Sequence, residues 1–509
     1  MSAQSRVLEV VGRSGAAVLL LLLVLPVVAT VLLRTLPRFD LLFESPGFHV
    51  VVVSAIAACA LMVALFTAVV AARVRRAAPV LLALGCVCIG FLMLGHGLTT
   101  PGILGRPLNM WVARFPVLAI AGFALCLMAA TADEDSVVKR GVARHPRGLL
   151  LLVTLGLAVF SLVIVARPTA LWGTEPFPGE TAVTDVVIVA SALGLLLSGA
   201  IHWRRWRLSG DRVELTLVLA CWLSVDSLVS FELGHLWRLS WWDYHAYLLA
   251  GFAAAAWAVV AESRRTRSLE GALAGISVTD PVEHIVRGYP EALHALTAAV
   301  EAKDRYTHGH SARVADLSTK LGLRIGLDPD TLRGLARGAL LHDIGKIGVP
   351  DHVLNKPGAL TPDEWEWIVA HPVVGWEMAS RTPSLRDALA VVRHHHERWD
   401  GSGYPDRLEG KGIPMAARIA AVADVWDALT SDRAYRPAWP AEQALDHILG
   451  GMGSLFDPVC IEALVDLMAE QDLGPGNVRV APDVLEAAAR ACQAHRGRAR
   501  VSAGARRPG

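Results

Sequence analysis

Three consecutive histidines, His394–His396, precede the segment ERWDGSGYPD and form a conspicuous group of potential metal ligands. A single run of imidazoles is not a site, so other ligands must meet it from elsewhere in the chain. The segment LLHDIGKIG places His342 beside Asp343, with Lys346 following. Adjacent residues of a helix point about 100° apart, so both ligands can face one cleft, particularly at a helix end, which Gly345 would supply.

Three further residues from other segments extend this set of possible ligands. His371 stands before Pro372, a residue well suited to the first turn of a new helix. Asp424, in RIAAVADVWDALT, shares a helix face with Asp427 at a spacing of three. His310 lies in YTHGHSARV. Each of these is a weak signal alone, but together they offer at least five imidazoles and two carboxylates from five predicted helical segments.

This ligand set predicts a centre with two metal ions that share a bridging carboxylate. Mixed nitrogen and oxygen ligands without a thiolate favour iron or manganese over zinc. Two metals about 3.5–4 Å apart can activate water at neutral pH and clamp an in-line phosphoryl displacement. Lys346 would then neutralise a phosphate oxygen. The predicted chemistry is therefore metal-dependent hydrolysis of a phosphate ester.

The elements that must position these ligands are predicted to be helices. From Tyr289 onward apolar residues recur at helical spacing, for example Leu293, Leu296 and Val300. Strand-like alternation is scarce in this part of the chain. The pattern predicts an all-helical domain in the C-terminal half.

The N-terminal half is predicted to cross a membrane. The chain has 509 residues, 53% of them apolar, with a mean hydropathy of +0.44. Eight apolar stretches have the roughly 18–25 residues that a membrane span needs, and they lie near 15–33, 48–72, 79–98, 113–132, 148–166, 183–201, 213–233 and 244–261. Lys and Arg concentrate in alternate connecting segments, including 73–76, 139–147 and 204–212. The positive-inside rule then places both chain ends in the cytoplasm.

Charge and cysteine content exclude other classes. A net charge of +1 argues against a nucleic-acid-binding protein, which usually presents a basic face. Seven cysteines form no CxxC pair, and their odd number gives no disulfide framework. We interpret them as reduced and mostly buried thiols.

Several ionisable residues lie in or near the predicted spans. They are His96 in the third, Asp226, Glu232 and His235 around the seventh, and His245 at the start of the eighth. Such groups are costly at membrane depth and often functional. Two interpretations stay open: interfacial or helix-pairing groups, which the sequence favours, and a sensor for a ligand or metal.

The motifs HD, at His342–Asp343, and GYP, at Gly403–Tyr404–Pro405, resemble those of the HD-GYP phosphodiesterases, a branch of the HD phosphohydrolase superfamily. The resemblance spans roughly Ala292 to Val465 and includes EAKDRYTHGHSARVADLS, LLHDIGKIGVPDHVLNKPGALTPDEW, HHHERWDGSGYP and IPMAARIAAVADVWDALTSDRAYR in the order of the family. It implies hydrolysis of cyclic di-GMP to pGpG, GMP or both.

Matching the motifs residue by residue implies a specific ligand set. Some members of the family have a glutamate associated with a third metal at the position of Tyr306, so its absence favours two metals, iron or manganese. His394 would be a neighbour of the centre, and Asp343 the bridging and catalytic carboxylate. The expected metal ligands are His310, His342, Asp343, His371, His395, His396 and Asp424.

The resemblance also implies substrate contacts. Lys346 matches a phosphate-contacting lysine, which makes it a catalytic residue as well, and the other expected contacts are Asp427, Arg433 and Arg436, with Arg313 a weaker candidate. The segment Gly403, Tyr404 and Pro405 has two interpretations. It is either a lip over the metal cleft, which we favour, or a contact for partner proteins such as diguanylate cyclases.

The predicted architecture is all-α. It comprises a polytopic membrane sensor or anchor domain (1–262), a linker (263–288), an HD-GYP domain (289–475) and an extension (476–509) whose end, from Arg496, is predicted to be disordered. The predicted function is a membrane-bound cyclic di-GMP phosphodiesterase of the bacterial cytoplasmic membrane, regulated by its spans and possible as a homodimer. The alternatives are a receptor whose HD-GYP module acts mainly as a nucleotide-responsive or docking switch, and an HD enzyme for another nucleotide such as cyclic GMP-AMP.

Overall fold

The computed structural model describes residues 23–504 apart from 75, 106–109, 134–135, 168–179, most of 267–290, 305–308, 433–436 and 471–479. Every extended regular element in these residues is a helix, and β-pairing is limited to isolated bridges. The prediction of an all-α protein is therefore confirmed. The chain divides into two compact units, Met1–Trp206 with Gly210–Asp280, and Pro281–Gly509 with Arg207–Ser209.

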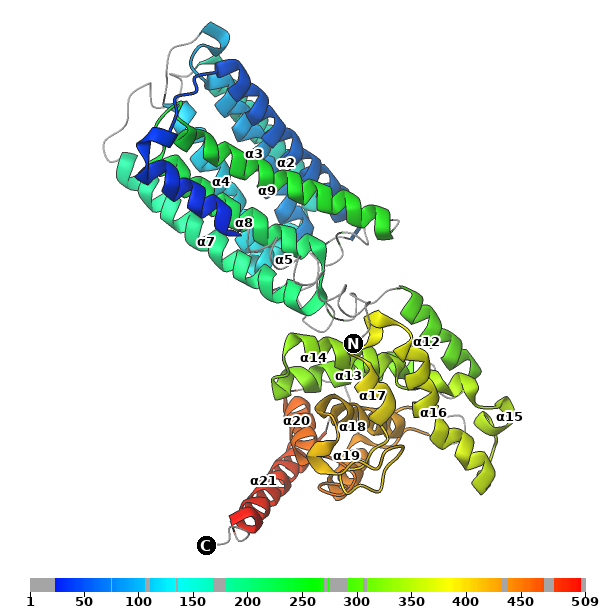
Figure 1. Cartoon of the computed structure of the whole chain (residues 1–509). Coiled ribbons are helices and arrows are strands. Elements are labelled where there is room, and N and C mark those ends of the chain that lie inside the picture. The colour runs from blue at the N-terminus through cyan, green and yellow to red at the C-terminus, as the bar shows by residue number, and fades with distance from the viewer. Residues whose placement is uncertain are drawn as a thin grey trace. The chain divides into compact units, whose positions relative to one another are not determined.

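The first unit is a bundle of long apolar helices (Figure 1). Seven of them are long and apolar enough to cross a membrane: α2 (Pro46–Val74), α3 (Ala77–Thr99), α4 (Trp111–Thr131), α6 (Pro146–Ala166), α7 (Glu180–Ser209), α8 (Arg212–Leu233) and α9 (Leu239–Thr266). Shorter elements are η1 (Pro37–Phe39), η2 (Ile103–Gly105) and α5 (Val137–Arg144). The first predicted span, 15–33, lies partly outside the described residues, and its described part belongs to a helix over Leu23–Thr35.

Burial distinguishes inner from outer helices in this unit. Helix α3 is largely buried, between α2 and α4, while α8 packs against α9. Helices α6 and α7 instead expose large apolar side chains such as Leu151, Leu155, Val186 and Leu193. An exposed apolar face of this extent needs a cover, and a lipid bilayer supplies one for helices of this length.

The second unit is a compact set of shorter helices around one apolar core. They are α12 (Glu291–Lys303), α13 (His310–Ile325), α14 (Pro329–Leu341), η4 (Ile344–Gly348), α15 (Asp351–Leu354), α16 (Pro362–Ser380), η5 (Pro383–Leu385), α17 (Leu389–His394), η6 (Gly410–Gly412), α18 (Met415–Thr430), α19 (Ala441–Gly450), α20 (Pro458–Ala469) and α21 (Pro482–Gly504). Helix α13 packs against α14, α18 and α20. Buried alanines of α18, such as Ala420 and Ala423, let its neighbours approach closely.

Local sequence signals set several of the helix ends in this unit. The Asp328 side chain accepts hydrogen bonds from the first backbone N–H groups of α14, with Pro329 next to it. Thr361 and Glu364 form a reciprocal capping box at the start of α16. These caps fix where the helices begin, and therefore which turn of each helix carries a ligand.

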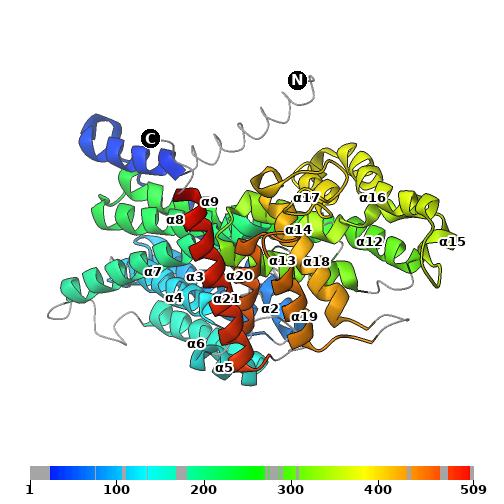
Figure 2. The ribbon, with the colours of Figure 1, turned by 90° about the horizontal axis from the view of Figure 1, so that it is seen from below.

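The C-terminal extension differs in part from the prediction. Helix α21 packs on α20 and continues to Gly504, whereas the sequence predicts disorder from Arg496 (Figure 2). Alanine and arginine are among the stronger helix formers, and this composition outweighs the low apolar content of the tail. Most of the predicted linker lies outside the described residues, and α9 reaches Thr266 at its start.

Candidate metal centre

The His342–Asp343 pair lies at a helix end, as the sequence predicts. Helix α14 ends at Leu341, His342 follows as its C-cap, and Asp343 precedes η4. Nδ1 of His342 donates to the carbonyl oxygen of Ala339 at 2.7 Å. Nε2 is buried, makes no well-aligned hydrogen bond to any described residue, and lies 3.4 Å from Asp343 Oδ2. A buried nitrogen with a free lone pair beside a carboxylate is the arrangement that a metal ion satisfies.

Gly345 has a different role from the predicted one. It lies inside η4, beyond the end of α14, and a Cβ at this position would overlap the carbonyl oxygen of His371. Only glycine allows η4 to come this close to α16. The close approach brings His371 Nε2 within 3.4 Å of Asp343 Oδ1.

The prediction that Pro372 begins a new helix is wrong. Pro372 lies inside α16, next to His371. Proline has no backbone N–H, so the carbonyl oxygen of Ile368, four residues earlier, loses its usual helical partner. Nδ1 of His371 lies 2.6 Å from that oxygen and donates to it instead. The proline thereby fixes the imidazole so that Nε2 is left to face the centre.

The run His394–His396 lies at the end of α17, and His394 is the last residue of that helix. Nε2 of His395 lies 3.3 Å from Nε2 of His371. Nδ1 of His395 lies 3.1 Å from the carbonyl oxygen of Val392. The His396 ring lies beside that of His395, with centroids 4.2 Å apart. His394 points elsewhere, with Nδ1 3.4 Å from Asp406 Oδ2. The structure therefore separates His394 from the other two histidines of the run.

His310 occupies the other side of the centre, at the first turn of α13. Its Nε2 lies 3.2 Å from Asp424 Oδ1, and its Nδ1 lies 2.7 Å from Asp427 Oδ2. Asp427 also pairs with Arg313, whose Nε lies 2.6 Å from Oδ1. A carboxylate on the far nitrogen of a ligating histidine fixes its tautomer and orientation. In this structure Asp427 and Arg313, predicted as substrate contacts, hold His310.

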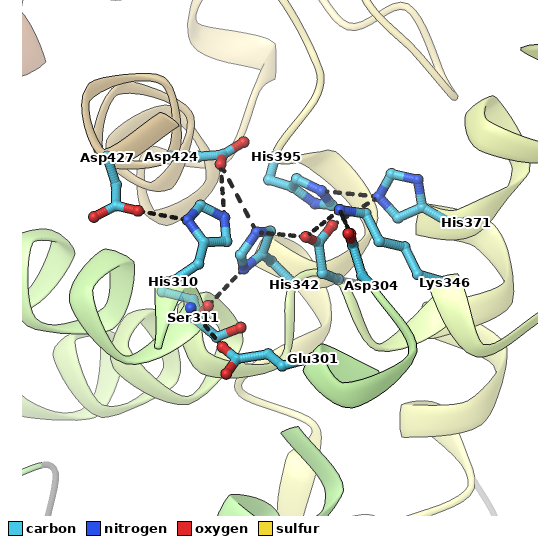
Figure 3. Close-up of polar contacts among 12 residues, drawn as sticks. Glu301, Asp304, His310, Ser311, His342, Lys346, His371, His395, Asp424 and Asp427 are labelled. Carbon is cyan, nitrogen blue, oxygen red and sulfur yellow. Dashed lines mark hydrogen bonds and ion pairs between the residues drawn. The ribbon is translucent and has the colours of Figure 1, made fainter. Parts of the chain in front are cut away.

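The donor atoms fall into two groups that share Asp343, and Figure 3 shows His310 and His342 toward one side of the centre and His371 and His395 toward the other. One contains Asp343, His371, His395 and His396, and the other contains His310, His342 and Asp343, each with its donors within 4.8 Å of one another. Asp424 Oδ1 lies near the second group, 3.9 Å from His342 Nε2. The structure thus brings all seven predicted ligands together, and their nitrogen and oxygen donors fit two divalent transition-metal ions.

The two groups differ in electrostatics. Burial lowers the pKa of His371 to about 4 and that of His396 to about 3, so both are neutral at pH 7. Burial also opposes the charged form of His310, but hydrogen bonds to Asp424 and Asp427 outweigh it and raise the pKa to about 9. Although burial favours its neutral form, His342 and Lys346 keep the pKa of Asp343 well below its usual value. The carboxylate is therefore ready to bind metal.

Lys346 lies at the solvent side of the centre. Its Nζ is 2.6 Å from Asp343 Oδ2 and 3.2 Å from Asp304 Oδ2, and 18% of its side chain is exposed. The Asp424 side chain is also 18% exposed. A ligand can reach the donors here, where a positive charge lies beside the metal-binding carboxylate.

Sequence reasoning missed two acidic residues that support the site. Asp304 pairs with Lys346, and Glu301 accepts hydrogen bonds from the backbone N–H groups of Gly309, at 2.8 Å, and Ser311, at 3.0 Å. Glu301 therefore holds the first turn of α13, which carries His310. Both residues lie in or beside the EAKDRYTHGH segment, but their spacing from His310 gives no signal of these contacts.

The GYP segment folds back on the ligand-bearing chain. Buried Glu397 accepts hydrogen bonds from the backbone N–H groups of Asp406, at 2.7 Å, and Leu408, at 3.1 Å. A Cβ on Gly403 would overlap the backbone of Glu397 and Arg398, and Tyr404 lies against the His396 ring, with centroids 4.8 Å apart. The Tyr404–Pro405 bond is cis. The segment lines the centre and buttresses His396.

Three residues from the sequence interpretation cannot be placed. Arg433 and Arg436, predicted as substrate contacts, and Tyr306, at the position of a possible third-metal ligand, lie outside the described residues.

A protein-family profile matches a segment in the C-terminal half of the chain. The profile described as an HD domain matches residues 294–460. We refer to residues 294–460, which match this profile, as the HD domain. The match contains all seven predicted metal ligands, and it confirms at the level of this domain the resemblance that the motifs indicate.

Relatives of this domain include named cyclic-dinucleotide phosphodiesterases. The chain is 42% identical over 177 residues to the cyclic di-GMP phosphodiesterase response regulator RpfG of Xanthomonas campestris pv. campestris, covering 34% of this chain and 47% of the relative. It is 41% identical over 182 residues to a cyclic di-GMP phosphodiesterase of Thermotoga maritima, covering 35% and 50%. It is 38% identical over 178 residues to the 3'3'-cGAMP-specific phosphodiesterase 2 of Vibrio cholerae serotype O1, covering 35% and 34%. The chain spans half or less of these three relatives.

Proposed function

We propose that this protein is a metal-dependent phosphodiesterase that hydrolyses cyclic di-GMP. The observation that carries the proposal is the pair of donor groups that share Asp343 inside an HD domain. Two relatives of this domain are named cyclic di-GMP phosphodiesterases. A switch without turnover would not need both donor groups complete, and the structure has both.

Two bound metal ions, which we propose to be iron or manganese, would supply an activated water and neutralise charge on the phosphate. The residues of the chain then hold and orient the reactants. Lys346 places an ammonium group 2.6 Å from Asp343, where it would contact a phosphate oxygen bound at the metals. Asp427 holds the proton on Nδ1 of His310, so that Nε2 faces the centre. Tyr404 covers His396 from the side of the GYP segment.

We further propose that the enzyme is anchored in the bacterial cytoplasmic membrane with both chain ends in the cytoplasm, and that the membrane unit regulates it. Seven apolar helices support the anchor, and the distribution of Lys and Arg supports the orientation. The cytoplasmic HD domain would then reach a nucleotide that is made inside the cell. Homodimers and diguanylate cyclase partners remain predictions from the sequence.

A second substrate has specific support. Three relatives, 33–38% identical, are named 3'3'-cGAMP-specific phosphodiesterases. The described donor groups would serve either cyclic dinucleotide, because they would act on the phosphodiester and not on the base. The residues that select a base must therefore lie outside the metal centre.

The test uses the full chain in detergent, loaded with Mn²⁺ or Fe²⁺, and a panel of cyclic di-GMP, 3'3'-cGAMP and cyclic di-AMP. Release of pGpG or GMP from cyclic di-GMP, faster than hydrolysis of the other two, supports the proposal. An Asp343→Ala variant should lose this activity. Equal turnover by wild type and Asp343→Ala, or binding without turnover, would contradict the enzyme function, and preference for 3'3'-cGAMP would replace the substrate.

A further inference from the structure

A second histidine cluster lies in the membrane unit. His49 is in the first turn of α2, His96 in the last turn of α3 and His245 in the second turn of α9, and all three side chains are fully buried. Three helices from distant parts of the sequence therefore place one imidazole each at the same end of the bundle. His49, in the segment GFHVVVV, carried no signal in the sequence.

The three imidazoles converge on one point through the same atom. Nε2 of His49 lies 3.0 Å from Nε2 of His96 and 2.8 Å from Nε2 of His245, and the latter two nitrogens lie 3.3 Å apart. The Tyr244 hydroxyl lies 2.9 Å from His96 Nε2. A tetrahedral ion with nitrogen ligands at about 2.0 Å separates them by about 3.3 Å. One pair already has this spacing, and the other two need to open by only a few tenths of an ångström.

The hydrogen bonds on the far sides of the rings fix which nitrogens carry protons. Nδ1 of His96 lies 2.8 Å from the carbonyl oxygen of Val112, to which only an N–H can donate. The Thr100 hydroxyl donates to the carbonyl oxygen of His96, so its oxygen accepts from Nδ1 of His49 at 2.9 Å. In their neutral forms His49 and His96 therefore both present a lone pair at Nε2.

Two lone pairs 3.0 Å apart repel each other when no cation lies between them. His245 can donate one proton to Nε2 of His49, and Tyr244 can donate one to Nε2 of His96, but the 3.0 Å contact between these two nitrogens is left without a proton. A cation bonded to Nε2 of both His49 and His96 would remove this repulsion. Backbone and hydroxyl partners on the opposite nitrogens are what orients histidines that bind metal.

We propose that His49, His96 and His245 form a transition-metal site in the membrane unit, selective for copper or zinc. Imidazole suits these ions, while calcium and magnesium require oxygen ligands that this group does not offer. Buried Trp237, Trp241 and Trp242 surround the cluster, with the Trp241 ring centroid 4.7 Å from that of His245. If both chain ends are cytoplasmic, this end of the bundle faces away from the cytoplasm, and the site takes its metal from outside the cell interior.

The test must separate this site from the HD-domain centre. It uses the full chain in detergent, with Asp343→Ala and His395→Ala to disable the HD-domain centre, loaded separately with Zn²⁺ and with Cu⁺ and then desalted. We expect about one metal per chain, and at least a tenfold loss of bound metal in His96→Gln and in His245→Gln. His202→Gln is the matched control, because His202 is a buried histidine of the same unit that pairs with Glu214 and lies outside the cluster.

Three outcomes decide the proposal. Absence of bound metal in the chain with an intact cluster would overturn it, and so would equal retention by the His96→Gln and His245→Gln variants. If those variants do not fold, X-ray absorption of the metal-loaded chain with an intact cluster decides alone. A spectrum with three imidazole ligands supports the site, and a spectrum without them refutes it.

Discussion

The two histidine clusters of this protein differ in their other ligands, and that difference separates two kinds of chemistry. In the HD domain, five histidines share their centre with Asp343 and Asp424, and Lys346 lies at the solvent side. In the membrane unit three histidines meet among tryptophans with no carboxylate in the group. Carboxylates neutralise the charge of divalent ions, and the partly exposed Lys346 and Asp424 leave the HD-domain centre accessible to water and substrate, whereas the three imidazoles of the membrane unit are fully buried.

The comparison also shows how each cluster is held. The HD-domain histidines are oriented by a freed helix carbonyl at Ile368, by the carbonyl oxygen of Ala339 and by the carboxylate of Asp427. The membrane histidines use the carbonyl oxygen of Val112 and the hydroxyl of Thr100. Hydrogen bonds on the far nitrogen therefore orient His342, His371 and His310 in one cluster and His49 and His96 in the other, whereas Nδ1 of His245 has no well-aligned partner among the described residues.

The largest expected effect is the loss of Asp343, since both donor groups of the HD domain share it. Asp343→Ala should lower the rate of cyclic di-GMP hydrolysis by about a thousandfold or more, because several kcal/mol of charge stabilisation depend on the metals. The measurement is turnover by the full chain with Mn²⁺. Asp363→Ala, which removes an exposed carboxylate from the first turn of α16, is the control and should retain activity.

The triple histidine gives the next largest effect. His395→Ala and His396→Ala should each reduce bound metal and turnover by about a hundredfold, because each removes a direct ligand. His394→Ala should change them much less, since His394 faces Asp406. Metal analysis of the three variants checks this, and equal damage from all three would show that the ligands are assigned incorrectly.

A smaller effect is expected where a residue acts through a ligand. Asp427→Asn leaves His310 in place but removes the charge on its far nitrogen, so metal affinity of the HD-domain centre should fall about 10–100-fold. Metal titration of the full chain measures it. Substitution of an exposed carboxylate on the same unit, Asp387→Asn, should leave the affinity unchanged. A loss of substrate affinity with intact metal binding would instead return Asp427 to the role of a substrate contact.

The two donor groups should also differ in the pH dependence of their metal affinity. The pKa of His310 is raised to about 9, so the metal-free histidine is protonated at pH 7, and metal must displace that proton. The metal affinity of the donor group that contains His310 should therefore rise with pH, by about tenfold per unit, and level off above pH 9. Burial lowers the pKa of His371 to about 4, so ligands on the other side add no such slope near neutral pH. Proton release measured during metal titration at pH 7 and pH 9 tests the sign.

Much of the metal centre follows from residue types and motif spacing alone. His342–Asp343 at the end of a helix and an all-helical domain are predicted from residue types and spacing, and the resemblance to the HD-GYP family adds the separation of His394 from its two neighbours. The prediction for Pro372 is wrong because a proline inside a helix is rare. No local signal in the sequence shows that this proline frees a carbonyl oxygen for the neighbouring His371 side chain. Asp304 and Glu301 were missed for a related reason: they contact residues that only the fold brings to them.

The membrane unit shows more clearly which features the sequence alone does not predict. Hydropathy determines that long apolar helices exist, since each stretch by itself satisfies the length and composition of a span. It cannot show that His49, His96 and His245 meet, because their separations in sequence are fixed by loops and spans and not by any helical period. The sequence by itself determined which chemistry the HD domain could support and that the N-terminal half could enter a membrane. Only the tertiary structure decided that a second set of imidazoles points at one place, because convergence depends on how helices pack and not on what each helix contains.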